Sequence, residues 1–189
     1  MSATPPLPRY GRVHLTFDDG PDATWTERCL EVLSAAGARA TFFMIGAQAR
    51  RWPGLVRQIA SEGHAIGNHT ATHAHPWTLG EATARAEVRD GAAAIADIIG
   101  MPSTLFRPPH GARRRCMLEE AAAQGESLVM WDRSAIDWGW WGRADGIARR
   151  LQRARNGDVI LMHDGANKHN RPDQLLQVLP AFLSNQINS

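Results

Sequence analysis

Short apolar runs alternate along this chain with longer segments that carry apolar residues on one helical face. The apolar runs predict six strands, at residues 13–17, 40–45, 65–67, 104–106, 127–131 and 159–162. The longer segments predict six helices, at residues 24–37, 47–62, 78–99, 113–124, 144–154 and 174–183. Strands that alternate with helices through short connections run parallel, so the pattern predicts an α/β fold.

Polar side chains follow most of these predicted strands at the point where the strand ends. They are Asp18 and Asp19 after the first strand, His69 and His73 after the third, Arg107 after the fourth, Asp137 after the fifth and His163 after the sixth. Active sites of β/α barrels are assembled from the carboxyl ends of several strands. No glycine-rich phosphate loop follows the first strand, as a dinucleotide-binding sheet would require. The pattern favours an incomplete (β/α) barrel over an open sheet.

Two of the predicted helices begin with the sequence pattern of a capping box. Thr24 is followed three residues later by Glu27, and Thr78 by Glu81. In such a box the threonine hydroxyl accepts a hydrogen bond from the first turn, and the acid returns one to the threonine N–H. We therefore expect Thr24 and Thr78 to cap these helices.

Composition narrows the class of protein. The 189 residues are 43% hydrophobic and 21% charged, which predicts one domain over residues 1–189 with a short irregular N-terminal segment, 1–11. A formal net charge of +2 gives no reason to expect a nucleic-acid partner, and no protein partner is indicated. No apolar stretch has the length of a signal peptide or a membrane span, so we expect a cytoplasmic protein, unless an export segment has been removed. Cys29 and Cys116 are expected to be reduced.

Asp18 and Asp19 stand side by side at the end of the first predicted strand, which Gly20 and Pro21 terminate. Two adjacent carboxylates repel each other unless a cation lies between them or one binds a proton. The same residues are also common in simple turns. The pair by itself therefore leaves a metal site and a turn as alternatives.

His69 and His73 are four residues apart, a spacing that on a helical turn directs both imidazoles to one face. Two surface histidines would have the same spacing. If the pair binds metal, Asp19 is the natural third ligand, since two histidines and a carboxylate form a catalytic site for zinc or a similar ion. Asp18 would then remain free as a base, and hydrolysis of an acyl group would suit the site.

Five short motifs occur in order along the chain. They are Thr-Phe-Asp-Asp-Gly at 16–20, His-Thr-Ala-Thr-His at 69–73, Arg-Pro-Pro-His-Gly at 107–111, Asp-Trp at 137–138 and Leu-Met-His-Asp at 161–164. Together they resemble the motifs of the polysaccharide deacetylase family, the NodB-homology domain of carbohydrate esterase family 4. The resemblance extends from about residue 13 to 183, is closest in form to chitooligosaccharide deacetylases, and implies a distorted, incomplete (β/α) barrel.

The resemblance also implies roles for individual residues. Asp19, His69 and His73 match the family's metal ligands, for zinc by default, although cobalt, nickel or manganese could occupy the same ligands. Asp18 matches the catalytic base that deprotonates water on the metal, and Arg107 matches the arginine that orients this base. His163 matches the general acid.

The remaining implied positions concern the substrate. Trp138 and Leu161 match the apolar pocket for the acetyl methyl group. The residues after Pro108 match the oxyanion site, so Pro109, His110 and Gly111 are expected at the substrate, with the His110 N–H as a donor to the oxyanion.

The implied activity is the metal-dependent removal of N-acetyl groups from oligo- or polysaccharides that contain N-acetylglucosamine, of the chitooligosaccharide, chitin or peptidoglycan type, with release of acetate. Two alternatives are an O-deacetylase of the acetylxylan esterase type and a non-catalytic carbohydrate-binding relative. The chain departs from the family at His110, where tyrosine is usual, and at Ser134, where a carboxylate is common. The second departure leaves open whether Asp137 can pair with His163.

Aromatic residues near the fourth motif have two interpretations. Trp140 and Trp141 could form a platform for a sugar ring or could pack in the interior. Trp25 and Trp52 are expected to be structural.

Overall fold

The structure is a computed structural model that describes residues 7–187. Residues 1–6 of the predicted irregular segment 1–11 lie outside the described residues. Within the described part, residues 7–9 form no regular element, and Tyr10 makes an isolated antiparallel bridge with Val13 just before the first strand.

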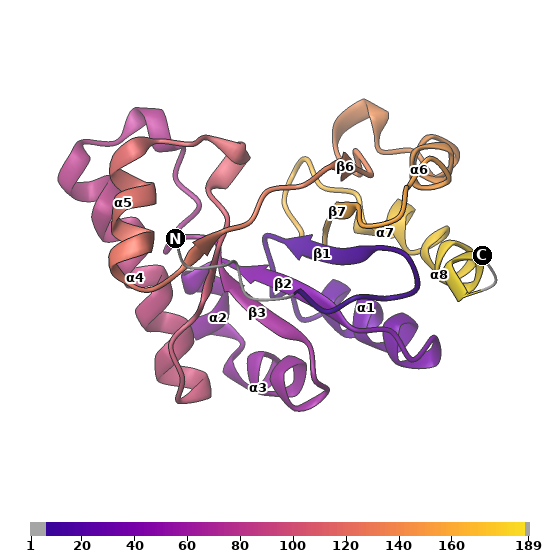
Figure 1. Cartoon of the computed structure of the whole chain (residues 1–189), viewed down its shortest axis with the longest axis horizontal. Helices are drawn as coiled ribbons and strands as arrows, with labels where there is room; N and C mark the ends of the chain where they lie inside the picture. Colours follow the sequence, from indigo (N-terminus) through magenta and orange to yellow (C-terminus); the bar gives the residue numbers. More distant parts are fainter. Residues whose placement is uncertain (1–6, 188–189) are drawn as a thin grey trace.

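Seven parallel strands form one curled, open sheet (Figure 1). They are β1 (His14–Asp18), β2 (Ala40–Met44), β3 (Ala65–Asn68), β4 (Leu105–Phe106), β5 (Ser127–Leu128), β6 (Arg133–Ser134) and β7 (Val159–His163). Their order across the sheet is β5-β4-β3-β2-β1-β7-β6. This half-barrel confirms the predicted incomplete (β/α) barrel.

Helices surround the sheet on its outer side (Figure 1). They are α1 (Trp25–Ala35), α2 (Gly46–Arg51), α3 (Pro53–Ser61), α4 (Glu81–Ile99), α5 (Arg115–Ala123), α6 (Ala144–Leu151), α7 (Pro172–Leu175) and α8 (Leu179–Ile187). Three 3-10 turns, η1 (Pro76–Thr78), η2 (Pro109–Gly111) and η3 (Gly139–Trp141), lie in the loops. None of the helices within residues 7–187 has the length and apolar character needed to cross a membrane.

The central strands are buried on both faces, as parallel sheets require. Phe17 of β1 stacks on Phe42 of β2 with ring centroids 5.2 Å apart, and neither side chain is more than 1% exposed. Burial of such a side chain contributes about 1.5–3 kcal/mol. This packing fixes β1, whose carboxyl end carries Asp18, against β2.

Two predicted helices are each divided in the structure. The predicted helix 47–62 is broken at Trp52, between α2 and α3, because Pro53 has no N–H with which to continue the helix. The predicted helix 174–183 is divided into α7 and α8, and Pro180 occupies the first turn of α8, where a missing N–H costs nothing.

Both predicted capping boxes are wrong. Thr24 already has helical dihedral angles, so its side chain makes no capping bond. Asp22 Oδ1 instead accepts hydrogen bonds from the N–H groups of Thr24 and Trp25, at 2.9 and 3.0 Å. At α4 the cap position is Gly80, and the Thr78 hydroxyl donates to the carbonyl of His75.

The predicted strand 127–131 ends early, at Leu128, and β6 was not predicted. Residues 129–132 leave one edge of the sheet and join the other. Val129 N–H still bonds to the carbonyl of Phe106, at 2.9 Å, whereas Asp132 N–H bonds to that of Val159, at 3.0 Å. The segment therefore spans the open side of the half-barrel, and a local apolar pattern carries no information about this change of partner.

Candidate active site

A pocket of about 470 Å³ lies at the carboxyl ends of the strands. It is lined by Asp18, Asp19, His69, His73, His110, Gly111, Trp131, Trp138, Leu161, His163, Asn167, His169 and Asn170. Residues from the ends of β1, β3 and β7 therefore meet, as the sequence pattern predicted. Arg107 and Asp137 are fully buried behind this lining, and Pro109 is buried without lining the pocket.

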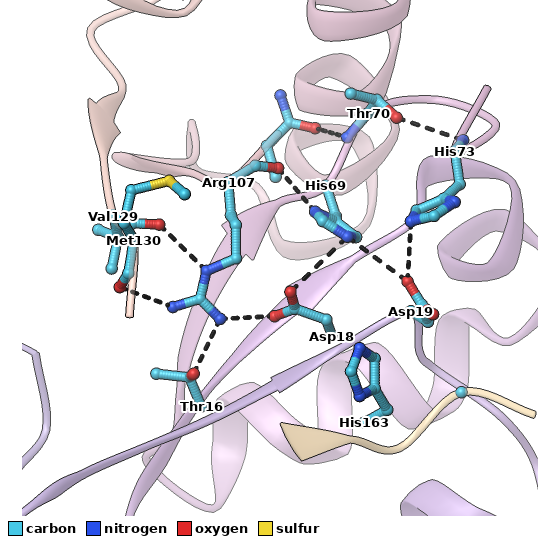
Figure 2. Close-up of polar contacts among 12 residues, drawn as sticks. Thr16, Asp18, Asp19, His69, Thr70, His73, Arg107, Val129, Met130 and His163 are labelled. Atoms are coloured by element: carbon cyan, nitrogen blue, oxygen red, sulfur yellow. Dashed lines mark hydrogen bonds and ion pairs between the residues drawn. The ribbon is translucent and has the colours of Figure 1, made fainter. Parts of the chain in front are cut away.

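Asp19, His69 and His73 are brought together with one ligand atom each within 4.8 Å of the others. Asp19 Oδ1 lies 3.1 Å from Nε2 of His73 and 3.4 Å from Nε2 of His69. The other oxygen, Oδ2, accepts hydrogen bonds from the amides of Asn167 and Asn170, at 3.1 and 2.7 Å. The amides thus fix the carboxylate with Oδ1 directed at the two histidines (Figure 2).

The two histidines lie on a loop and not on the helical turn that the sequence suggested. The loop turns sharply because Thr70 and His73 both have positive φ, at 69° and 62°. The His69 Nδ1–H donates to the carbonyl of Arg107 at 2.6 Å, which leaves the Nε2 lone pair facing Asp19. A loop with two left-handed residues therefore achieves the convergence that was expected from helical periodicity.

The donor set fits a divalent metal. Asp19 Oδ1 is buried and has no hydrogen-bond partner among the described residues. Buried carboxylate oxygens normally have a partner, and a cation between Asp19 and the two histidines would supply one. Burial raises the pKa of Asp19, but the nearby imidazoles of His69 and His73 lower it more, and the net pKa lies well below the usual value. Two imidazole nitrogens and one ionised carboxylate are a common protein ligand set for catalytic zinc.

Asp18 is held by a buried arginine. Arg107 Nη1 donates to Asp18 Oδ1 at 2.7 Å and to the Thr16 hydroxyl at 2.8 Å (Figure 2). The other side of the guanidinium donates to the carbonyls of Val129 and Met130, at 3.0 and 3.2 Å. Because both side chains are buried, this pairing keeps Asp18 oriented, with Oδ2 3.7 Å from Nε2 of His69.

His163 is paired with Asp137. The Nδ1–H of His163 donates to Asp137 Oδ1 at 2.9 Å, and Asp137 Oδ2 accepts the backbone N–H of His163 at 2.8 Å. Burial lowers the pKa of His163, but the charge and hydrogen bond of Asp137 outweigh it and raise the pKa to about 9. Asp137 therefore pairs with His163 although Ser134 replaces the family's carboxylate, and the Ser134 hydroxyl accepts the N–H of Ile136.

His110 stands at the rim of the pocket. Its backbone is left-handed, with φ at 57°, and its ring lies 4.8 Å from that of His73 and 4.9 Å from that of His75. Within residues 7–187 its backbone N–H makes no hydrogen bond. The N–H is thus available as a donor, and the histidine ring takes a packing place beside the metal loop.

Some pocket residues were missed by sequence reasoning. Trp131 had been included in a strand, and Asn167 and Asn170 resembled ordinary loop residues. Their nearness to the motif at 161–164 was the one available signal. The residue that their carboxamides bind, Asp19, is about 150 positions away in the sequence, so no local pattern links them. His169 also lines the pocket.

The other tryptophans differ in how exposed they are and in whether they line the pocket. Trp138 lines the pocket and meets His163 edge to face, with ring centroids 5.3 Å apart. Trp140 and Trp141 are 94% and 71% exposed, so neither is a packing residue. Trp25 and Trp52 are partly buried beneath the guanidinium groups of Arg28 and Arg51.

Comparison with known proteins gives consistent results. The family model "Polysaccharide deacetylase" matches residues 8–129. A peptidoglycan-N-acetylglucosamine deacetylase of Bacillus cereus is 35% identical over 171 residues, which cover 89% of this chain and 80% of that protein. A chitooligosaccharide deacetylase of Sinorhizobium fredii is 34% identical over 181 residues, or 93% and 82% of the two chains. The structure of a family 4 carbohydrate esterase from Streptomyces lividans in complex with acetate superimposes with a TM-score of 0.82 at 36% identity, over 94% and 88% of the two chains.

Proposed function

Because this chain belongs to the polysaccharide deacetylase family, we propose that it hydrolyses the N-acetyl groups of oligo- or polysaccharides that contain N-acetylglucosamine and releases acetate. The observation that carries the proposal is the convergence, in one pocket, of three metal-ligand side chains, an arginine-held carboxylate and a carboxylate-held imidazole. Relatives named for peptidoglycan and for chitooligosaccharides support this substrate class.

Asp19, His69 and His73 would hold the metal, for which zinc is the first expectation. When bound there, the ion would act as a Lewis acid and lower the pKa of water. The pairing of Asp19 Oδ2 with Asn167 and Asn170 orients this ligand before any ion arrives.

Asp18 is the proposed base. Its Oδ1 is occupied by Arg107, so Oδ2 is the oxygen that accepts a proton from the attacking water. Arg107 remains protonated and keeps the carboxylate fixed in a buried position. The water oxygen then bonds to the acetamide carbon, and the carbonyl oxygen becomes an oxyanion.

The His110 N–H is the proposed donor to that oxyanion. The direction of this backbone N–H depends on the left-handed conformation of residue 110 and not on its side chain. Histidine can therefore take the place of the tyrosine that is usual in the family. Trp138 and Leu161 supply apolar surface for the acetyl methyl group.

His163 is the proposed acid. Its Nδ1 is bonded to Asp137, so Nε2 is the nitrogen that gives a proton to the leaving amine as the carbon–nitrogen bond breaks. With a pKa of about 9, the imidazole is protonated at neutral pH and ready to donate. The products are acetate and a free amino sugar.

The test is acetate release from chitooligosaccharides and from peptidoglycan fragments, by the chelated protein and the zinc-reconstituted protein side by side. Acetate that depends on zinc supports the proposal, and the better substrate identifies the polymer. Acetylated xylan in the same assay distinguishes an O-deacetylase. Binding of chitooligomers without acetate from any substrate would instead indicate a non-catalytic relative.

A further inference from the structure

A buried carboxyl group lies outside the pocket. Glu126, between α5 and β5, is 5% exposed, and its Oε1 has no hydrogen-bond partner among the described residues. Burial raises its pKa to about 8, although the hydrogen bond from Asn68 and the nearby Ser103 hydroxyl lower it. No arginine or lysine within residues 7–187 forms an ion pair with Glu126, so its burial costs free energy of folding. Glu126 does not line the pocket, and the proposed chemistry does not use it.

Glu126 is linked to the metal loop through one side chain. Its Oε2 accepts a hydrogen bond from Asn68 Nδ2 at 3.0 Å. Asn68 is fully buried, ends β3 and directly precedes His69. Its Nδ2 also donates to the carbonyl of Val88 in α4, at 2.9 Å, so both amide hydrogens are used.

The carboxamide oxygen of Asn68 acts on the loop itself. Oδ1 accepts the N–H of Thr70 at 2.9 Å. Thr70 is left-handed, a conformation that costs a β-branched residue about 1 kcal/mol or more, and its hydroxyl accepts the N–H of His73 at 3.2 Å. A chain of hydrogen bonds therefore runs from Glu126 through Asn68 and Thr70 to His73.

The enclosure of this carboxamide leaves it little freedom. A Cβ on Gly91 of α4 would clash with Asn68 Oδ1 and with the backbone of Thr70. Helix α4 thus packs directly on the turn, and only the orientation with Oδ1 toward Thr70 and Nδ2 toward Val88 and Glu126 satisfies every partner.

We propose that Glu126 and Asn68 are positioning residues of the metal site: Glu126 fixes the Asn68 carboxamide, which holds the left-handed turn from which His69 and His73 reach Asp19. This inference rests on the proposed function for the identity of the site. It predicts that loss of the Glu126 acceptor weakens metal binding without any change to a ligand.

The experiment measures the Kd for Zn²⁺ alone, by competition with a chromophoric chelator, together with thermal unfolding of the same samples. Glu126→Leu removes the acceptor and should weaken Zn²⁺ binding about tenfold or more, as loss of an outer partner of a metal ligand commonly does. Glu126→Gln keeps an oxygen for Asn68 Nδ2 and should stay within about twofold of wild type.

Leu128→Ala is the matched structural control. Leu128 is in β5, two residues after Glu126, and packs against the apolar cluster that contains Phe106 and Met117. It takes part in none of the hydrogen bonds of the Asn68 side chain. The substitution should lower the unfolding temperature and leave the Kd for Zn²⁺ unchanged. Asn68→Ala is a second test of the same link and should weaken Zn²⁺ binding at least as much as Glu126→Leu, should that variant fold poorly.

The proposal would be overturned if Glu126→Leu and Leu128→Ala lost the same affinity for Zn²⁺. It would also be overturned if the Glu126→Leu protein were less stable but bound Zn²⁺ like wild type. If wild-type protein binds Zn²⁺ but releases no acetate, the proposed function is refuted. The Kd values of the Glu126 variants for Zn²⁺ then still decide whether Glu126 positions the metal site. Wild-type protein that binds no Zn²⁺ would refute both.

Discussion

The two sides of the pocket are built in different ways. On the metal side, Asp19, Thr70 and His73 all have positive φ, and amide and backbone hydrogen bonds hold the ligands. On the acid side, His163 is the last residue of β7, and one buried carboxylate, Asp137, sets its orientation and charge. The metal side therefore depends on a constrained backbone, and the acid side depends on one electrostatic pair attached to a regular strand.

Metal removal should have the largest effect. Chelation, or His69→Ala, should lower kcat by about 10³-fold or more, because the ion and the water it activates are lost together. Acetate release from a chitooligomer measures the activity, and readdition of Zn²⁺ should restore the chelated protein but not the variant. Full activity in a protein shown to be metal-free would contradict the assignment of the ligands.

His163→Asn should come next, with kcat lower by about 10²–10⁴-fold, the usual contribution of a general acid. Since His163 belongs to the other side of the pocket, the Kd for Zn²⁺ should remain close to that of wild type. Chelator competition checks this separation. A variant that lost metal and activity together would show that the two sides are not independent.

Asp137→Asn should have an intermediate effect that depends on pH. Asp137 raises the pKa of His163 to about 9, and the acid must be protonated to donate, so wild-type kcat/KM should fall as pH rises through that value. Without the carboxylate the fall should occur at lower pH, nearer the ordinary pKa of about 6.5, with about a thirtyfold loss of rate at pH 8.

The pairing of Asp137 with His163 should also make the free energy of unfolding depend on pH. A raised pKa in the folded state stabilises the protein fully below about 6.5 and ceases to do so as pH rises through about 9. Asp137→Asn should remove this dependence from the free energy of unfolding, measured in urea at several pH values. For activity, an Asp137→Asn variant whose kcat/KM falls at the same alkaline pH as that of wild type would show that another group causes the fall.

Trp140→Ala should have the smallest effect. Trp140 is 94% exposed beside Trp138, so we expect it to stack on a sugar beyond the one in the pocket. Loss of one aromatic contact costs about 0.5–1.5 kcal/mol, so KM should rise about two- to tenfold for long oligomers and hardly at all for short ones. Trp77→Ala, at another tryptophan that is 63% exposed, is the control. Equal changes for all lengths would contradict the platform.

Much of the fold could be predicted from the chain alone. Buried parallel strands have continuous apolar runs, and helices have one apolar face, so the alternation that produces the half-barrel is visible locally. Asp18 and His163 were found for the same reason, since each is the final residue of such a strand. Pro53 could also have been recognised as a helix break, because its missing N–H is a local property.

Other features depend on partners that are distant in sequence. Residues 129–132 change from one sheet edge to the other, and the carbonyls of Val129 and Met130 bind Arg107 only because the barrel curls. The pairing of Asn167 and Asn170 with Asp19 and of Glu126 with Asn68 likewise requires the completed fold.

The class of fold and the order of the motifs could thus be obtained from residue type and periodicity along the chain. The expected metal ligands and the proposed acid and base came from the resemblance of those motifs to the polysaccharide deacetylase family, because spacing alone left other interpretations open. The completed fold was needed to show that a left-handed loop brings His69 and His73 to Asp19, and that Asp137 pairs with His163 although residue 134 is a serine. The physical reason is that hydrogen bonds and ion pairs between distant segments depend on position in space, which no local pattern encodes.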